Sequence, residues 1–173
     1  MKSFWTIGLT RFVALAVLAL GAAGVVAAAS TDAAAADPPD SVAQRPDVLN
    51  ADVRQDTISS TICVAGYTAS IRPSTRYTQG VKFKLMQAQS IPRADASGYE
   101  LDHRIPLALG GHPRALANLM LQPWEGERGA KKKDRLERAM QRMVCNGTLA
   151  LDQARDAIFS DWEAAYRSFI PQR

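Results

Sequence analysis

An acidic residue followed directly by a histidine, Asp102-His103, begins the stretch of this sequence best suited to chemistry. After the pair come two glycines at 110–111, an Asn-Leu pair at 118–119 and three lysines at 131–133. Hydrolysis of a phosphodiester needs a deprotonated water, neutralisation of the negative charge on the phosphate oxygens and stabilisation of the leaving oxygen. Neutral imidazole can take the proton because its pKa lies near working pH, and a divalent cation can supply the rest. These residues therefore indicate metal-assisted cleavage of phosphodiesters.

The order of these residues is also specific. The string is Asp-His-x-Ile-Pro-Leu-x-Leu-Gly-Gly, followed after six residues by Asn-Leu and then by a basic stretch. It resembles the HNH endonucleases, whose ββα-metal core is also called the His-Me finger. Upstream, Thr-Ile-Cys-x-x-Gly-Tyr-Thr at 61–68 resembles secreted HNH-like proteins. The resemblance implies an α+β fold with a hairpin-plus-helix core and flanking helices, and an endonuclease of low sequence specificity that depends on a divalent metal.

The resemblance also implies roles for single residues. His103 would be the general base, and Asp102 would bind Mg²⁺ or Mn²⁺, which prefer oxygen ligands. Asn118 would hold the long connection in place and orient the histidine. Nucleic acid is the implied partner, with DNA favoured, and no small-molecule cofactor is expected. The basic residues expected to hold phosphates at the helix opening are Lys131, Lys132, Lys133 and Arg135; any one of them alone could equally be solvated surface charge.

One position departs from the HNH pattern. These enzymes usually carry a further metal ligand, His or Asn, one turn before a lysine in the first turn of the helix, and here Ala130 stands at that position. Adjacent strand residues also point to opposite faces, so Asp102 and His103 share a site only if the strand ends or bulges there. Two alternatives therefore stay open: a catalytically degenerate domain that binds nucleic acid, and a structural protein of the cell envelope.

Hydrophobic periodicity predicts the elements that must position these residues. Strands are expected over 99–105 and 118–122, with an irregular connection over 106–117, and Pro123 should end the second strand. Residues 129–145 should form the basic helix, with an apolar stripe along one side. Further helices are expected over 75–89, capped by Ser74 or Thr75, and over 151–169. Residues 58–67 hold short β-favouring pieces and a glycine turn.

The chain of 173 residues, 47% hydrophobic, suggests one domain behind a leader. Residues 1–29 carry two positive charges and an apolar run that ends among small residues, which is typical of a secretory signal peptide. An uncleaved membrane anchor is the alternative. Residues 30–56 are rich in Ala, Asp and Pro and are expected to be a flexible linker, and residues 57–173 to be the HNH-like domain. We expect a secreted or periplasmic monomer with no membrane span after cleavage.

The distribution of charge and the two cysteines give two further predictions. Removing residues 1–29 takes away Lys2 and Arg11, so the formal charge falls from +4 to +2 and says little about nucleic acid. The positive charge is local: residues 128–142 hold seven basic and two acidic side chains. Cys63 and Cys145 are the only cysteines. In an exported protein such a pair predicts a disulfide, and two separately buried thiols are the alternative.

Overall fold

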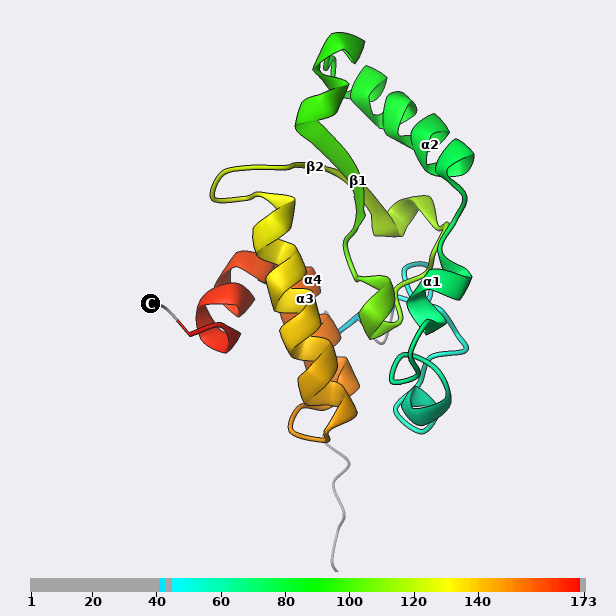
Figure 1. Cartoon of the computed structure of the whole chain (residues 1–173), viewed down its shortest axis with the longest axis vertical. Coiled ribbons are helices and arrows are strands. Elements are labelled where there is room, and N and C mark those ends of the chain that lie inside the picture. The colour runs from blue at the N-terminus through cyan, green and yellow to red at the C-terminus, as the bar shows by residue number, and fades with distance from the viewer. Residues whose placement is uncertain (1–40, 43–44, 172–173) are drawn as a thin grey trace, which may run out of the picture. The chain divides into compact units, whose positions relative to one another are not determined.

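A two-stranded antiparallel hairpin and four α-helices form the part of the chain described by the computed structural model, residues 41–42 and 45–171. The strands are β1 (Tyr99–His103) and β2 (Leu119–Pro123). Short 3₁₀ turns occupy Ile58–Ser60, Arg93–Gly98, Leu107–Leu109 and Leu116–Asn118. The helices are α1 (Tyr67–Ile71), α2 (Thr75–Ala88), α3 (Ala130–Cys145) and α4 (Leu151–Phe169). The mixture is α+β, as the sequence predicts (Figure 1).

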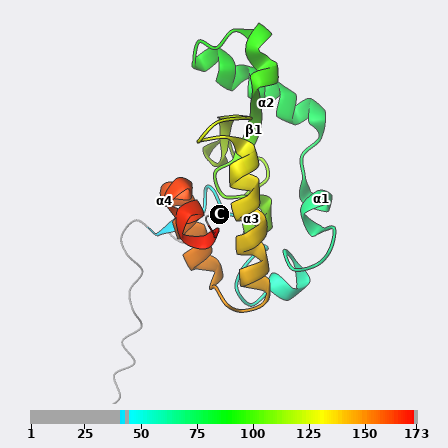
Figure 2. The same ribbon diagram turned by 60° about the vertical axis from the view of Figure 1, so that its left-hand side comes forward.

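The hairpin pairs its two strands without a bulge. Tyr99 lies opposite Pro123 and His103 opposite Leu119, so the acid-histidine pair is at the end of the ladder, where the long connection begins. Helix α2 packs against both strands and against the turn at Arg93–Gly98 (Figure 2). It begins at Ser74, whose hydroxyl accepts a hydrogen bond from the backbone N–H of Tyr77, as expected of an N-cap. One face of the hairpin is therefore covered by α2.

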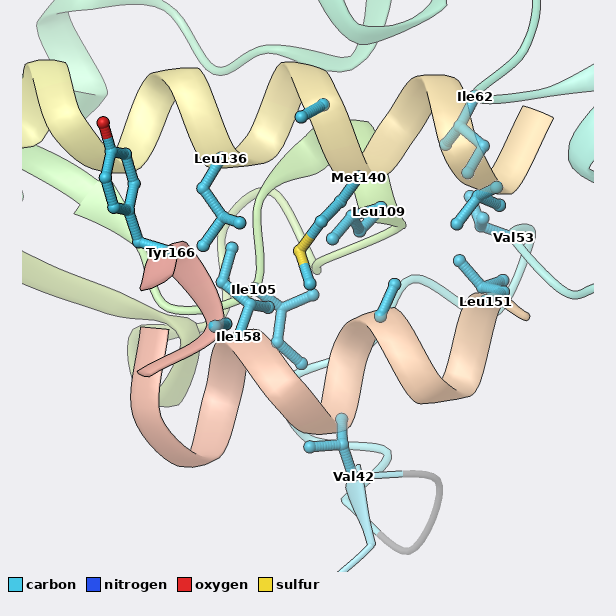
Figure 3. Packing of buried hydrophobic residues seen from close by; sticks show 14 of the residues in the cluster. Val42, Val53, Ile62, Ile105, Leu109, Leu136, Met140, Leu151, Ile158 and Tyr166 are labelled. Carbon is cyan, nitrogen blue, oxygen red and sulfur yellow. The ribbon is translucent and has the colours of Figure 1, made fainter. Parts of the chain in front are cut away.

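Helices α3 and α4 build the hydrophobic core together. Leu136 and Met140 of α3 are fully buried, and they face Leu151 and Ile158 of α4 (Figure 3). Ile105, from the connection after β1, enters the same cluster. Burying a Leu, Ile or Met side chain stabilises the fold by about 1.5–3 kcal/mol, so this contact fixes α3 firmly beside the connection.

Helix α4 is interrupted at Asp161, whose backbone leaves the helical region at φ −156°, ψ 90°. Its carboxylate accepts hydrogen bonds from the N–H groups of Glu163 and Ala164. Asp161 therefore acts as an N-cap for the last two turns, which lets that segment bend so that Tyr166 and Ile170 rejoin the core.

Residues 45–56 differ from the predicted flexible linker. Val48 and Val53 are at most 2% exposed and belong to the core, and Leu49 forms an isolated β-bridge with Gly111. Val42 is also buried, and its N–H donates to a carboxylate oxygen of Asp156. The linker prediction is therefore wrong for residues 41–42 and 45–56, because a few widely spaced valines are enough where they join the core of the domain. The predicted signal peptide and residues 30–40 lie outside the described residues.

Residues 58–67 also differ from the expected β-favouring pieces, since they form a 3₁₀ turn followed by the start of α1. The predicted disulfide is confirmed: Cys63 is bonded to Cys145, which ties this segment to the end of α3 across a separation of 82 residues. The disulfide fits an extracellular protein. None of the helices in the described ranges is long and apolar enough to cross a membrane.

Candidate functional site

Strand alternation separates the two residues of the acid-histidine pair. The carboxylate of Asp102 meets α3, whereas the imidazole of His103 reaches a carbonyl in the long connection and a cleft beside α2. The two stay close through the backbone, because one oxygen of Asp102 accepts the N–H of His103 at 2.7 Å. Asp102 and His103 therefore lie at the same end of β1 but face different surroundings.

On the α3 side, Asp102 contacts a buried lysine. The ammonium nitrogen of Lys133 lies 2.8 Å from Oδ2 of Asp102 and 2.8 Å from the backbone oxygen of His103. It also donates to Oε1 of Glu137, one helical turn farther along α3. The side chain of Lys133 is 1% exposed. We call these three oxygens, which come from Asp102, His103 and Glu137, the oxygen cage; Lys133 occupies it.

The charges in the oxygen cage depend on one another. Burial lowers the pKa of Lys133, but the carboxylates of Glu137 and Asp102 outweigh burial and the pKa is raised overall. Burial raises the pKa of Glu137 to about 7, against the attraction of Lys133. The two raised pKa values belong to one coupled pair, and we assign the charged state to Lys133 because its ammonium faces two carboxylates. Lys133 is therefore an ammonium ion and not a phosphate ligand, contrary to its predicted role.

Glu100 lies on the same face as Asp102, two residues earlier in β1. Burial raises its pKa to about 7, and the carboxylates of Asp102, Asp134 and Glu137 add to the shift. Its cross-strand partner is Gln122, whose side-chain Oε1 is buried without a hydrogen-bond partner among the described residues. This face of the hairpin therefore holds more carboxylates than the single ammonium of Lys133 can neutralise.

His103 is arranged as a neutral base. Its Nε2 lies 3.1 Å from the backbone oxygen of Pro113, and because a carbonyl can only accept, Nε2 carries the proton. The lone pair is then on Nδ1, which has no hydrogen-bond partner within the described ranges. Nδ1 is also not among the fully buried side-chain atoms that lack a partner, so it is accessible to solvent. Burial lowers the pKa of His103, opposed by Pro113 and Asp102. A neutral imidazole with an accessible Nδ1 can accept a proton.

The cleft beside His103 has a volume of about 310 Å³ and lies between the start of α2 and β1. Two of its side chains are cationic, Arg72 and Lys82. The ammonium of Lys82 donates to the backbone oxygens of Ala96 and Tyr99, and these two hydrogen bonds hold its positive charge at the side of the cleft. Trp124, which follows β2, is 37% exposed and also lines this cleft. The cleft thus combines a base, two cations, an aromatic ring and the carboxyl group of Glu100.

Asn118 holds the connection between the strands. Its Oδ1 accepts the N–H of Ile105 at 2.8 Å, and its Nδ2 donates to the backbone oxygens of Ile105 and His112 at 3.0 and 3.1 Å. Gly111 is needed beside it, because a Cβ there would lie 1.8 Å from the oxygen of Ile105. This network sets the path to Pro113, the acceptor of His103, so Asn118 positions the imidazole through the backbone.

The remaining predicted phosphate ligands lie on the surface of α3. Lys131 and Lys132 pair with Glu125 and Glu127 in the turn before the helix. Arg135 is exposed above the ring of Tyr166. Farther along α3, one groove of about 520 Å³ is lined by residues that include Arg135, Arg138, Arg142 and Phe169. Of the four predicted basic ligands, Arg135 is therefore the one with an open cationic surface beside it.

Sequence reasoning missed Arg72 and Lys82 in the cleft, Glu137 in the oxygen cage and Pro113 as the acceptor of His103. Glu137 is four residues after Lys133, and an acid and a base at that helical spacing are neighbours, so the spacing could have indicated the pair. The role of Pro113 could not have been found, because its contact with His103 uses a backbone carbonyl and depends on the path of an irregular connection.

A divalent cation does not fit these residues as they are arranged. Within the described ranges, no three side chains of His, Cys, Asp or Glu come together in a way that could hold a metal ion. Lys133 already donates to a carboxylate oxygen of the predicted ligand Asp102 and to the two other oxygens of the cage. Comparisons with family models, with curated proteins and with solved structures find no match for this chain.

Proposed function

We propose that this protein is an HNH-like phosphodiesterase that acts on nucleic acid, with β1, β2 and α3 as its hairpin-plus-helix core. His103 is the general base: Nδ1 takes a proton from the attacking water while Nε2 stays bonded to Pro113. Arg72 and Lys82 neutralise charge on the phosphate, and Trp124 offers a surface for a base to stack on. The proposal includes no step through Mg²⁺ or Mn²⁺, since Lys133 holds the oxygens that such an ion would need.

The state of His103 is the observation that carries this proposal. An imidazole that served only the core would have both nitrogens satisfied, whereas here one nitrogen is fixed by Pro113 and the other lacks a partner within the described ranges. Burial lowers its pKa below the ordinary value of 6.5, so the ring is neutral at pH near 7. We further propose that the protein is exported, in keeping with its disulfide.

The test is cleavage of labelled single-stranded DNA, duplex DNA and RNA by the purified protein, with chelator or with added Mg²⁺ or Mn²⁺. His103→Asn keeps a donor for Pro113 but removes the base, and we expect it to lower the rate by about 10²–10⁴-fold. Lys84→Ala, on the exposed side of α2, is the matched control and should cleave like the wild type. Equal rates for His103→Asn and wild type would show that His103 is not the base.

A second candidate is binding of nucleic acid without cleavage, which the occupied oxygen cage favours. The groove lined by Arg135, Arg138 and Arg142 could then follow the phosphate backbone. Fluorescence anisotropy with DNA at several salt concentrations tests it. Each of the three changes to alanine should make the salt dependence shallower by about one phosphate contact. Arg54 is an exposed arginine that pairs with Asp56 and is distant in sequence from α3. Arg54→Ala should therefore leave the salt dependence unchanged.

A further inference from the structure

We infer that the ammonium of Lys133 takes the place of a divalent cation between β1 and α3, and that removing this side chain would create a site for Mn²⁺ or Mg²⁺. The comparison with a metal centre rests on the proposed HNH-like core. The contacts that support the inference do not depend on that proposal, because they come from the geometry of three oxygens around one nitrogen.

The oxygen cage matches the three hydrogens of an ammonium group. The acceptors are a carboxylate oxygen of Asp102, the backbone oxygen of His103 and a carboxylate oxygen of Glu137. All three donors of Lys133 are used, and its side chain is 1% exposed, so no water is needed to complete the arrangement. Lys133 is therefore a buried cation whose three N–H donors are all hydrogen-bonded.

The same three oxygens would suit a hard metal ion. Two carboxylates and one backbone carbonyl are the ligand types that Mg²⁺ and Mn²⁺ prefer, and water completes their shells. They converge on one point because Lys133 already bonds all three. A Lys133→Ala variant would leave two carboxylates facing each other without a cation, in a cavity that the lysine side chain had filled.

The wild-type protein excludes the metal from this position. An ion at bonding distance from these oxygens would lie almost on the ammonium nitrogen, and two cations so close repel each other strongly away from bulk water. Lys133 cannot swing aside easily, because its backbone is in the first turns of α3, which Leu136 and Met140 anchor in the core. The fold therefore needs no metal at this position.

The experiment measures binding of Mn²⁺ and thermal unfolding, and it does not measure cleavage. For the wild type we expect no stoichiometric Mn²⁺ binding by electron paramagnetic resonance, and the same unfolding temperature in chelator and in Mn²⁺. Lys133→Ala should unfold at a lower temperature in chelator, bind one Mn²⁺ and recover several degrees as the ion saturates the site. Adding Glu137→Gln to that variant should weaken Mn²⁺ binding at least about tenfold. Lys131→Ala, an exposed lysine of the same helix, should behave like the wild type.

Two results would overturn the inference: one Mn²⁺ bound by the wild type and lost in Asp102→Asn, or a folded Lys133→Ala protein that binds none. If Lys133→Ala does not fold, Lys133→Ser is the second variant, since its smaller polar side chain leaves the same oxygens free. If neither folds, the wild-type titration decides by itself, because binding contradicts the inference and its absence with unchanged unfolding in chelator supports it. Failure to cleave nucleic acid would count against the proposed function and leave this result as it stands.

Discussion

Asn118→Ala should be among the most destabilising substitutions near the candidate site. Asn118 is 0% exposed and makes three hydrogen bonds, one from the backbone N–H of Ile105 and one each to the backbone oxygens of Ile105 and His112. Alanine would leave these buried backbone groups without their partner. Since the connection runs from Ile105 through Pro113 to Asn118, the same change should also release the acceptor that orients His103.

The magnitude follows from these three bonds. An unsatisfied buried backbone group costs about 1–3 kcal/mol, and water that enters the gap recovers part of this, so we expect a loss of about 3–5 kcal/mol. A domain of ordinary stability has about 5–15 kcal/mol in total, so the variant should stay folded at low temperature. The unfolding temperature should fall by roughly 10–20 °C.

Urea unfolding followed by circular dichroism measures this loss. Asn118→Asp separates hydrogen bonding from volume, because the side chain keeps its size but turns an acceptor towards two backbone oxygens; it should cost at least as much as alanine. Asn146→Ala is the matched control, since Asn146 is exposed and its side-chain oxygen accepts hydrogen bonds from Thr148, two residues away. A loss below about 1 kcal/mol for Asn118→Ala would refute the reasoning.

Two further predictions concern stability. Replacing both Cys63 and Cys145 by serine should lower the free energy of unfolding by about 4–5 kcal/mol, given the 82-residue separation, and reductant should then have no further effect in guanidinium titrations. The pKa of Glu100 is raised from 4.5 to about 7, so its contribution to stability is present below pH 4.5 and is lost as the pH rises through about 7. Glu100→Gln should therefore remove on the order of 1–2 kcal/mol from the difference in unfolding free energy between about pH 5 and about pH 8, after allowance for solvent screening, and an unchanged difference would contradict the assignment.

Helices α2, α3 and α4 and both strands could be predicted because their signals are local. Each long helix shows apolar residues at helical spacing with polar residues opposite, and Ser74 marks the beginning of α2. The strands are short, but the turn residues and Pro123 limit them on both sides. Such patterns depend on nearby residues alone, so tertiary contacts need not be known.

The missed segments depend on contacts from elsewhere in the chain. Val48 and Val53 are apolar residues in a largely polar stretch, and they are buried because they join the core cluster with residues of the connection and of α4. The β-branched residues around Thr61 favour strands by propensity, yet they lie in turns that the disulfide from Cys63 holds against α3. Propensity is overridden where a covalent bond and a core fix the backbone.

The prediction that Lys133 binds phosphate failed for a different reason, because the sequence does contain a signal that its side chain is buried. Three consecutive lysines look alike as a cluster of charge, but successive helix residues are about 100° apart, so the three cannot share one face. Lys133 lies three residues before Leu136 and seven before Met140, which are buried, and so it must face inward with them. A lysine forced inward needs acidic partners, and strand alternation supplies Asp102 while the next helical turn supplies Glu137. It follows that the two sides of β1 have different main readouts: changes in the oxygen cage should alter stability and metal binding, and changes in the cleft around His103 should alter cleavage. Asp102 links the two sides, because it also accepts the N–H of His103.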